Sequence, residues 1–154
     1  MRYPWSLLLL LLLAQPLVNY SHACSDAEWA EGQALVEEFD AAYKDAISRY
    51  KSFCIWNESD MSRQRLCKML IDRDDRFPNE EVNMNAMLAL FKKTEAHWLM
   101  LSQSCSRSYR GDAYEKYNKM HEFGATVLYG EQGIESRYRQ CEEQIYQSYI
   151  KRCR

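Results

Sequence analysis

The sequence lacks the short patterns by which many enzymes, metal sites and β-sheets are recognised. The shortest gap between two of its six cysteines has eleven intervening residues, so no closely spaced pair indicates a zinc site. There is no GxSxG or HExxH motif, and no acidic loop with the glycine and distal glutamate of a calcium site. No segment alternates cleanly between apolar and polar residues, which argues against strands. We therefore expect no catalytic residues, no metal and no cofactor.

Long apolar runs are also scarce. The one unbroken leucine run, residues 7–13, is too short and too near the start to span a bilayer. Arg2 precedes it and Ser21-His22-Ala23 follows it, which is typical of a secretory signal peptide. Ala23-Cys24 also allows a bacterial lipoprotein as the lower-ranked alternative, although position 21 is serine where such signals normally have leucine. The pattern predicts a signal peptide at 1–23, a single domain at 24–154 and a released extracellular product without stable membrane insertion.

Blocks of one charge are missing too. Arg2 is the one charged residue in the first 23, so the remaining 131 residues carry 19 basic and 22 acidic side chains. A slightly negative chain without a basic block is a poor match for nucleic acid or for an anionic membrane surface. Its length is sufficient for one hydrophobic core.

What the chain does have is an even number of cysteines, all after the predicted signal peptide. Six cysteines in a small secreted chain indicate three disulfides, each contributing about 2–4 kcal/mol of stability. Cys54 and Cys67 flank a turn expected near residues 57–60, so we expect these two to pair across adjacent antiparallel helices. The pairing of the others stays open. The six are Cys24, Cys54, Cys67, Cys105, Cys141 and Cys153.

The dominant period is helical. Ser25 and Glu28 have the spacing of a capping box, which predicts a helix start directly after the cleavage point. Apolar residues then recur every three or four positions, which predicts a helix of about 28 residues that ends before residues 57–59. This stripe consists of Leu35, Phe39, Tyr43, Ile47, Tyr50 and Cys54.

The rest of the chain predicts three or four further helices. A short one is expected at about 60–72, ended by the segment around Pro78. Asn79 is a good N-cap for a third helix that runs to about Tyr109. A fourth is expected to begin after Gly111, and a last one to carry Ile134 through Tyr149.

Three of the five glycines lie at positions 124, 130 and 133, so we expect a break or hinge near residue 130. Together, these segments predict an all-α fold: an antiparallel bundle of four or five amphipathic helices stapled by three disulfides.

Arg110-Gly111-Asp112 matches the integrin-recognition triplet, but its position also has a structural explanation. Gly111 falls between the third and fourth expected helices, where a left-handed residue can close a helix. Asp112 and Glu115 repeat the capping-box spacing. We interpret the triplet as a helix junction, with an integrin ligand as the lower-ranked alternative.

Asn57-Glu58-Ser59 is an N-glycosylation sequon in an expected loop, so we predict a glycan on Asn57.

Methionine and aromatic residues are numerous, with seven methionines and eleven tyrosines in the chain. At helical spacing they usually form the core, but they can also line a cavity for an apolar guest. The residues that we select for such a pocket are Met87, Phe91, Trp98 and Tyr117.

The composition and missing motifs predict a secreted, non-catalytic binding protein that engages an extracellular protein partner. The alternative is a carrier of a lipid or another apolar small molecule. A closed cavity lined by methionine and aromatic side chains would favour the carrier, whereas a filled core with an exposed apolar patch would favour the protein partner.

Overall fold

The computed structural model describes residues 24–154, so the predicted signal peptide at 1–23 lies outside the described residues. The helices are α1 (Asp26–Cys54), α2 (Arg63–Ser104), α3 (Arg107–Phe123) and α4 (Ile134–Cys153), with a short π-helix, η1 (Gly124–Leu128), between the last two. Residues 24–154 contain no strand. The predicted all-α, disulfide-stapled helical bundle is confirmed.

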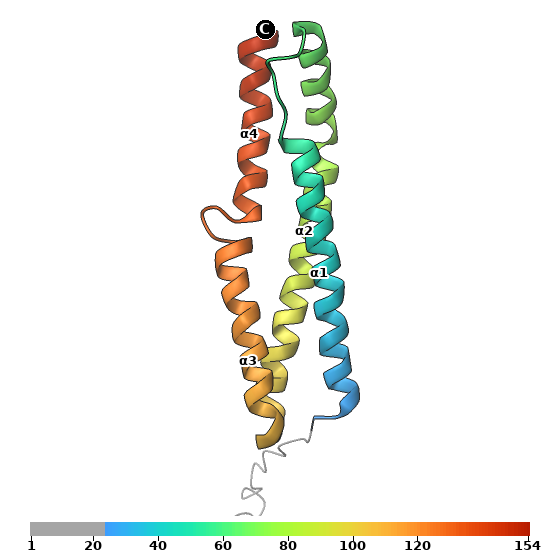
Figure 1. Cartoon of the computed structure of the whole chain (residues 1–154), viewed down its shortest axis with the longest axis vertical. Helices are drawn as coiled ribbons and strands as arrows, with labels where there is room; N and C mark the ends of the chain where they lie inside the picture. Colours follow the sequence, from blue (N-terminus) through green and yellow to red (C-terminus); the bar gives the residue numbers. More distant parts are fainter. Residues whose placement is uncertain (1–23) are drawn as a thin grey trace, which may run out of the picture.

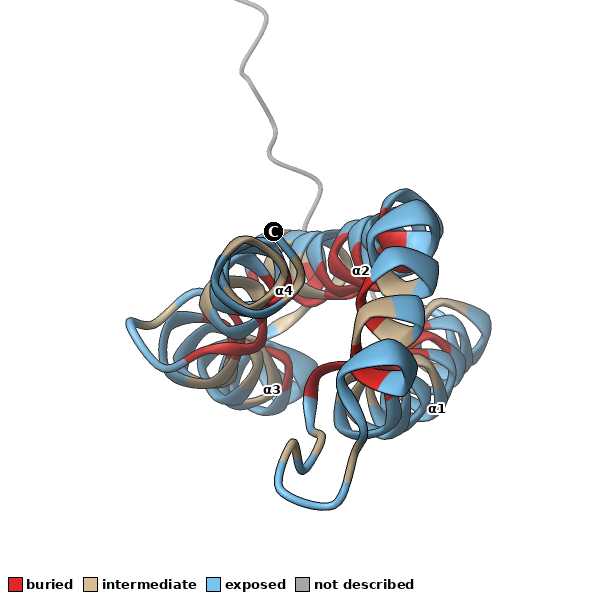
Figure 2. Cartoon of the chain, turned by 90° about the horizontal axis from the view of Figure 1, so that it is seen from above, coloured by how far each residue is buried: buried red, intermediate tan, exposed pale blue. Residues whose placement is uncertain are grey.

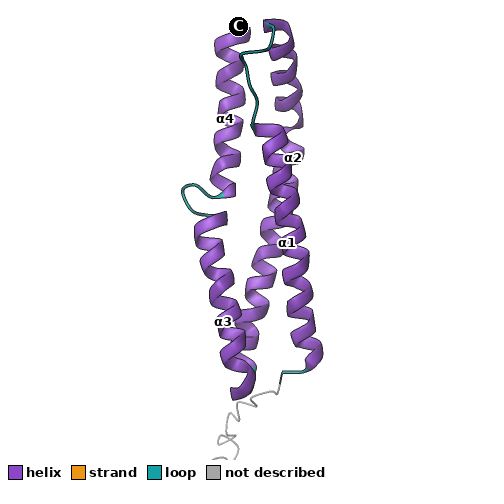
Figure 3. Ribbon diagram, in the orientation of Figure 1, coloured by secondary structure: helices purple, strands orange, loops and turns teal. Residues whose placement is uncertain are grey.

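The helices form a long rod of three antiparallel columns (Figure 1). The first column is α1 and the second is α2. The third column consists of α3, η1 and α4, which together run back along α2. Viewed from its end, the rod has its buried residues on the facing sides of the columns (Figure 2). At 1.5 Å per residue, the 42 residues of α2 span about 63 Å, but the 29 residues of α1 span only about 44 Å. The segment 55–62 covers the remaining distance as a loop (Figure 3).

The start of α1 is as predicted. The Ser25 hydroxyl accepts a hydrogen bond from the Glu28 backbone N–H at 3.2 Å, and the Ser25 backbone N–H donates to the Glu28 carboxylate at 2.8 Å. These two bonds form the capping box and satisfy amide groups that the first turn of a helix leaves unpaired. The helix ends at Cys54, before the sequon.

The predicted break around Pro78 is wrong, because α2 continues through it. Proline removes one hydrogen bond and normally disrupts a helix interior. Here Pro78 is exposed, while the apolar stripe on the opposite face runs on without interruption. Burial of that stripe outweighs the local cost of one proline. Its seven-residue repeat is Leu70, Phe77, Met84, Phe91 and Trp98, all buried.

The predicted junction at Gly111 is also wrong. α2 ends at Ser104, and Cys105 and Ser106 have extended backbones, with ψ of 154° and 162°. Ser106 is the N-cap of α3, so Gly111 and Asp112 lie inside that helix. No residue in 24–154 has a positive φ. The junction lies where the seven-residue repeat ends at Cys105, which is buried and disulfide-bonded to Cys24.

The expected break near residue 130 is present, as residues 129–133 form the turn between η1 and α4.

All six cysteines are paired, but the expected Cys54–Cys67 pair is wrong. The bonds are Cys24–Cys105, Cys54–Cys141 and Cys67–Cys153. A tight turn would have set Cys54 and Cys67 at one height, but the loop 55–62 is extended and carries the chain beyond the end of α1. Cys54 therefore lies level with Cys141 of α4, and Cys67 lies level with Cys153.

Candidate functional site

Of the four side chains proposed to line a pocket, three are buried and Tyr117 is half-buried; Met87 borders a hollow of about 280 Å³ between α1 and α2 that none of the other three lines. Met87 and Phe91 belong to the main core cluster, with 3% and 1% of their surface exposed. Trp98 is fully buried in a second cluster near the Cys24–Cys105 disulfide, and Tyr117 packs against that cluster from its edge. The structure therefore does not bring the four together around one cavity.

The Arg110-Gly111-Asp112 triplet lies exposed in the early turns of α3. The Arg110 Nε donates a hydrogen bond to the Cys105 carbonyl oxygen at 3.3 Å, which holds this side chain against the start of the helix. A helical triplet does not have the extended, protruding form that integrin ligands present. This position gives the integrin alternative no support.

Asn57 is exposed in the loop 55–62, as a glycosylation site requires. Its side-chain carbonyl oxygen accepts a hydrogen bond from the Ser59 backbone N–H at 3.1 Å and another from the Ser59 hydroxyl. This Asx turn fixes the sequon at the end of the rod where α1 is missing. Its glycosylation remains a prediction.

We call this end of the rod the apical end and define it as residues 55–74 and 141–154. Because α1 ends at Cys54, α2 and α4 are the two helices that pack together there (Figure 1). A pair of helices has two open sides, and loop 55–62 covers only one of them. The two sides differ in chemistry.

The uncovered side carries a groove of about 290 Å³ between α2 and α4, which we call the apolar groove. Leu70 and Ile145 are buried, whereas Ile71 and Tyr146 have 47% and 52% of their surface exposed. Ile71 is two residues from Arg73, which contacts the loop, and residues two apart on a helix differ in direction by about 200°. The groove therefore faces away from the loop. Its lining is Leu70, Ile71, Asp74, Ile145, Tyr146 and Tyr149.

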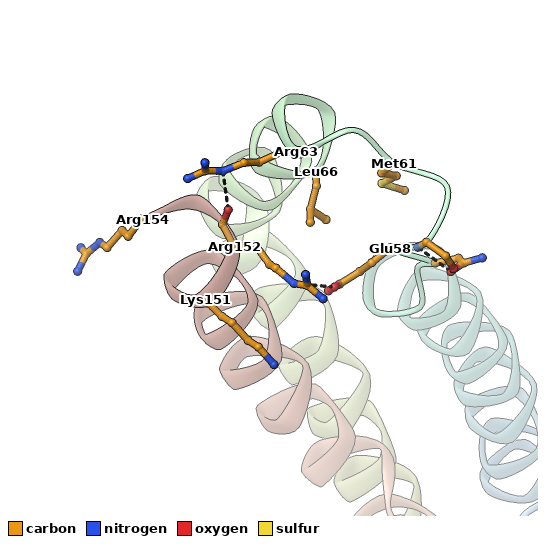
Figure 4. A pocket seen from close by; sticks show the side chains of 9 residues that line it. Glu58, Met61, Arg63, Leu66, Lys151, Arg152 and Arg154 are labelled. Carbon is orange, nitrogen blue, oxygen red and sulfur yellow. Dashed lines mark hydrogen bonds and ion pairs between the residues drawn. The ribbon is translucent and has the colours of Figure 1, made fainter.

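The loop side carries a concavity of about 950 Å³, which we call the basic concavity (Figure 4). Arg152 extends from α4 toward Glu58, with its Nε 3.7 Å from the Glu58 carboxylate. The Arg63 Nε donates a hydrogen bond to the Arg152 carbonyl oxygen at 2.9 Å, so α2 is tied to the end of α4. The lining is Asn57, Glu58, Ser59, Met61, Arg63, Leu66, Lys151, Arg152 and Arg154.

A chain of contacts holds loop 55–62 in place. The Arg73 guanidinium lies 4.7 Å from the Trp56 ring centre and donates a hydrogen bond to the Ser52 carbonyl oxygen at 3.3 Å. The Glu58 carboxylate accepts hydrogen bonds from the Trp56 indole N–H at 3.3 Å and from the Ser148 hydroxyl at 3.2 Å. Burial, and then the neighbouring charge of Arg76, lowers the pKa of Arg73 from its ordinary value. Glu58 thus joins the loop to α4.

The middle of the rod contains a buried polar group that the sequence did not reveal. Glu80 is 6% exposed, and one of its oxygens lies 3.8 Å from Arg49. Burial, and then the charge of Glu80, raises the pKa of Tyr138 to about 12. The Tyr138 hydroxyl donates a hydrogen bond to the Ala46 carbonyl oxygen at 3.4 Å. We assign this group to the packing between α1, α2 and α4.

Within residues 24–154, no group of three or more histidine, cysteine, aspartate or glutamate side chains is arranged to hold a metal ion. No helix in that range is long and apolar enough to cross a bilayer. Comparison of the chain with protein-family models, with curated proteins and with solved structures found no match. Function therefore has to be argued from the two surfaces at the apical end.

Reasoning from the sequence missed both surfaces, although one had a signal. Ile71 and Tyr146 are apolar residues one position beyond the buried Leu70 and Ile145, so they widen the apolar stripe of each helix past what the core needs. The basic concavity had no such signal, because its residues come from two stretches far apart in sequence, 57–66 and 151–154, that meet only in the fold.

Proposed function

We propose that the protein is a secreted, non-catalytic binding protein that engages an extracellular protein partner through the apolar groove. The observation that carries this proposal is the exposure of Ile71 and Tyr146 beside a floor of Leu70 and Ile145 at the one end of the rod that lacks a third helix. Three disulfides support an extracellular setting, since such bonds persist mainly in oxidising compartments.

The chemistry of the groove suits a protein more than a small molecule. Tyrosine offers a large apolar ring and a hydroxyl that can be satisfied at an interface, and such side chains dominate binding energy. Leu70 and Ile145, which form its floor, are buried, and the side chains of the core along the rod are buried as well. A core of buried side chains with an exposed apolar patch is the pattern expected for a binding partner rather than for a carrier.

The groove also indicates the kind of partner segment that it accepts. Elsewhere in the rod a third helix packs against α2 and its neighbour, so a helix is the natural occupant of a groove between two antiparallel helices. Asp74 lines the groove, and Asp75 and Glu142 lie one helical turn from Ile71 and Tyr146. We infer an amphipathic partner helix with an apolar ridge flanked by lysine or arginine.

Photo-crosslinking tests this proposal. A benzophenone amino acid replaces Tyr146 in one variant and Tyr114 in the other, since both tyrosines are about half exposed (52% and 56%) but Tyr114 lies outside the groove, on α3. In extracellular fluid of the source, we expect one protein adduct from position 146 and none from position 114. The adduct should disappear when Ile71→Glu is added.

The purified partner then provides the quantitative test. Ile71→Glu should weaken its binding by about 2 kcal/mol, roughly thirtyfold, because it places a charge in the centre of the contact. Asp74→Lys should weaken it by adding like charge beside a basic helix, and Tyr114→Glu should change nothing. Equal adducts from both positions, or full affinity in Ile71→Glu, would refute the groove as the binding site.

A further inference from the structure

We propose that the basic concavity is a binding site for a sulfated glycan chain, separate from the apolar groove. Four of its lining side chains are cationic, namely Arg63, Lys151, Arg152 and Arg154, and one is anionic, Glu58. The balance of these side chains is thus three positive charges, in a chain whose side chains sum to −2. A concave surface lined by one sign of charge concentrates ions of the opposite sign.

Much of this positive charge is not neutralised by the protein. In residues 24–154, neither Lys151 nor Arg154 has an ion-pair partner, and Arg152 approaches its single partner, Glu58, only to 3.7 Å. The Arg63 guanidinium uses its Nε for the Arg152 carbonyl oxygen, which holds the group in place while both terminal nitrogens stay available. Fixed guanidinium groups can bind oxyanions through two parallel hydrogen bonds.

The shape and remaining lining favour a sulfated glycan over a single anion or an acidic peptide. A volume of about 950 Å³ is far larger than one sulfate ion needs, and the cations come from both α2 and α4, so they suit several anionic groups on one chain. Ser59 adds a hydroxyl oxygen that can accept a hydrogen bond from a sugar hydroxyl. Met61 and Leu66 are the two apolar lining residues, so the site offers little to apolar peptide side chains.

The test uses the full mature protein made in a host that does not attach N-glycans, so that no glycan on Asn57 competes for the site. Isothermal titration measures binding of a fully sulfated heparin-derived octasaccharide, the same octasaccharide after desulfation, and a polyglutamate peptide. We expect binding of the sulfated octasaccharide, with affinity that falls as salt increases, and at least tenfold weaker binding of the other two.

A charge-matched pair of variants locates the site. Lys151→Glu with Arg154→Glu should weaken binding of the sulfated octasaccharide more than tenfold, whereas Lys44→Glu with Lys51→Glu, which makes the same change of net charge on exposed residues of α1, should weaken it less than threefold. Lys151→Arg with Arg154→Lys should bind like the parent.

Three results would overturn the proposal: equal losses in the two charge-reversal variants, equal binding of the desulfated octasaccharide, or tighter binding of polyglutamate. Circular dichroism confirms that each variant is folded. Because Lys151 and Arg154 do not line the apolar groove, failure here leaves the protein-partner proposal intact, and success does not establish it.

Discussion

Gly32 lies where α1 comes closest to the fully buried Trp98 of α2. A methyl group at position 32 would lie 2.7 Å from a ring carbon of Trp98, closer than van der Waals contact allows. Trp98 in turn makes an edge-to-face contact with Trp29, at 5.0 Å between ring centres. The glycine therefore allows two helices to approach around one large side chain.

Substituting two helical glycines tests this close approach. Gly32→Ala should destabilise the fold by about 1–3 kcal/mol, because a buried tryptophan cannot move aside without disturbing the core. Gly111→Ala is the matched control: its new methyl group meets nothing within 4 Å, so the higher helix propensity of alanine should stabilise the fold by about 0.5–1 kcal/mol. Chemical denaturation measures both values. Destabilisation by Gly111→Ala would show that this residue does close a helix.

The raised pKa of Tyr138 predicts how the stability of the fold depends on pH. With its pKa raised to about 12, the buried phenol keeps its proton at pH values where the unfolded chain has lost it. Stability is therefore unaffected by this group below pH 10 and falls between pH 10 and 12, by at most about 1.4 kcal/mol per pH unit. Tyr138→Phe should make the free energy of unfolding less steep in that range than Tyr146→Phe does. Identical slopes in the two variants would contradict the assigned burial.

At the scale of the elements, α2 is the helix that organises the rod. It contacts α1, α3 and α4, and its seven-residue repeat of buried side chains runs the whole length of the core. A repeat of seven is the spacing at which helices stay in contact along a shallow crossing angle. This repeat explains why one helix persists across a proline.

Substitutions at positions 78 and 79 distinguish one long helix from two short ones. If α2 is continuous, Pro78→Ala removes an unfavourable residue from a helix interior and should stabilise the fold by about 1–3 kcal/mol. Asn79→Ala should be neutral or slightly stabilising. If a helix instead began at residue 79, Asn79→Ala would remove its N-cap and cost about 0.5–2 kcal/mol, while Pro78→Ala would have little effect. Thermal and urea denaturation separate these outcomes.

The elements predicted correctly from the sequence are those whose signals are local. The capping box of Ser25 and the glycines around residue 130 act through neighbouring residues, and both predictions are confirmed. Pro78 and Gly111 are local signals as well, but the long apolar stripe of α2 outweighs the first, and the second lies past the point where that stripe ends. The Cys54–Cys67 pairing failed because it depends on the path of loop 55–62. The two apical surfaces depend on segments far apart in sequence, so no local pattern could predict them.

At the scale of the whole molecule, the three disulfides lie at intervals along the rod. One joins the start of α1 to the end of α2, the second joins the last residue of α1 to α4 where the apical end begins, and Cys67–Cys153 joins α2 to α4 within the apical end. Each closes more than 80 residues of chain, so each restricts the unfolded state strongly. The last bond has a special position, because no third helix supports the pair that it joins.

Removing that bond should therefore affect the two surfaces selectively. In Cys67→Ser with Cys153→Ser, we expect a loss of about 2–5 kcal/mol in global stability and faster hydrogen exchange at 63–74 and 141–153. In residues 80–101, where α2 packs against both other columns, protection against hydrogen exchange should fall only by the amount that the loss of global stability predicts. Uniform acceleration along the whole chain would show that the apical pair is not a separate unit of stability.

Native mass spectrometry of the protein purified from its natural source tests the central claim most directly. A core of buried side chains and a surface site for a protein partner predict the mass of the polypeptide alone, less two hydrogens for each of three disulfides, plus any glycan on Asn57. We expect no other retained small molecule. A lipid or other apolar compound that stays bound in one-to-one ratio and is released on unfolding would contradict the claim and identify the protein as a carrier.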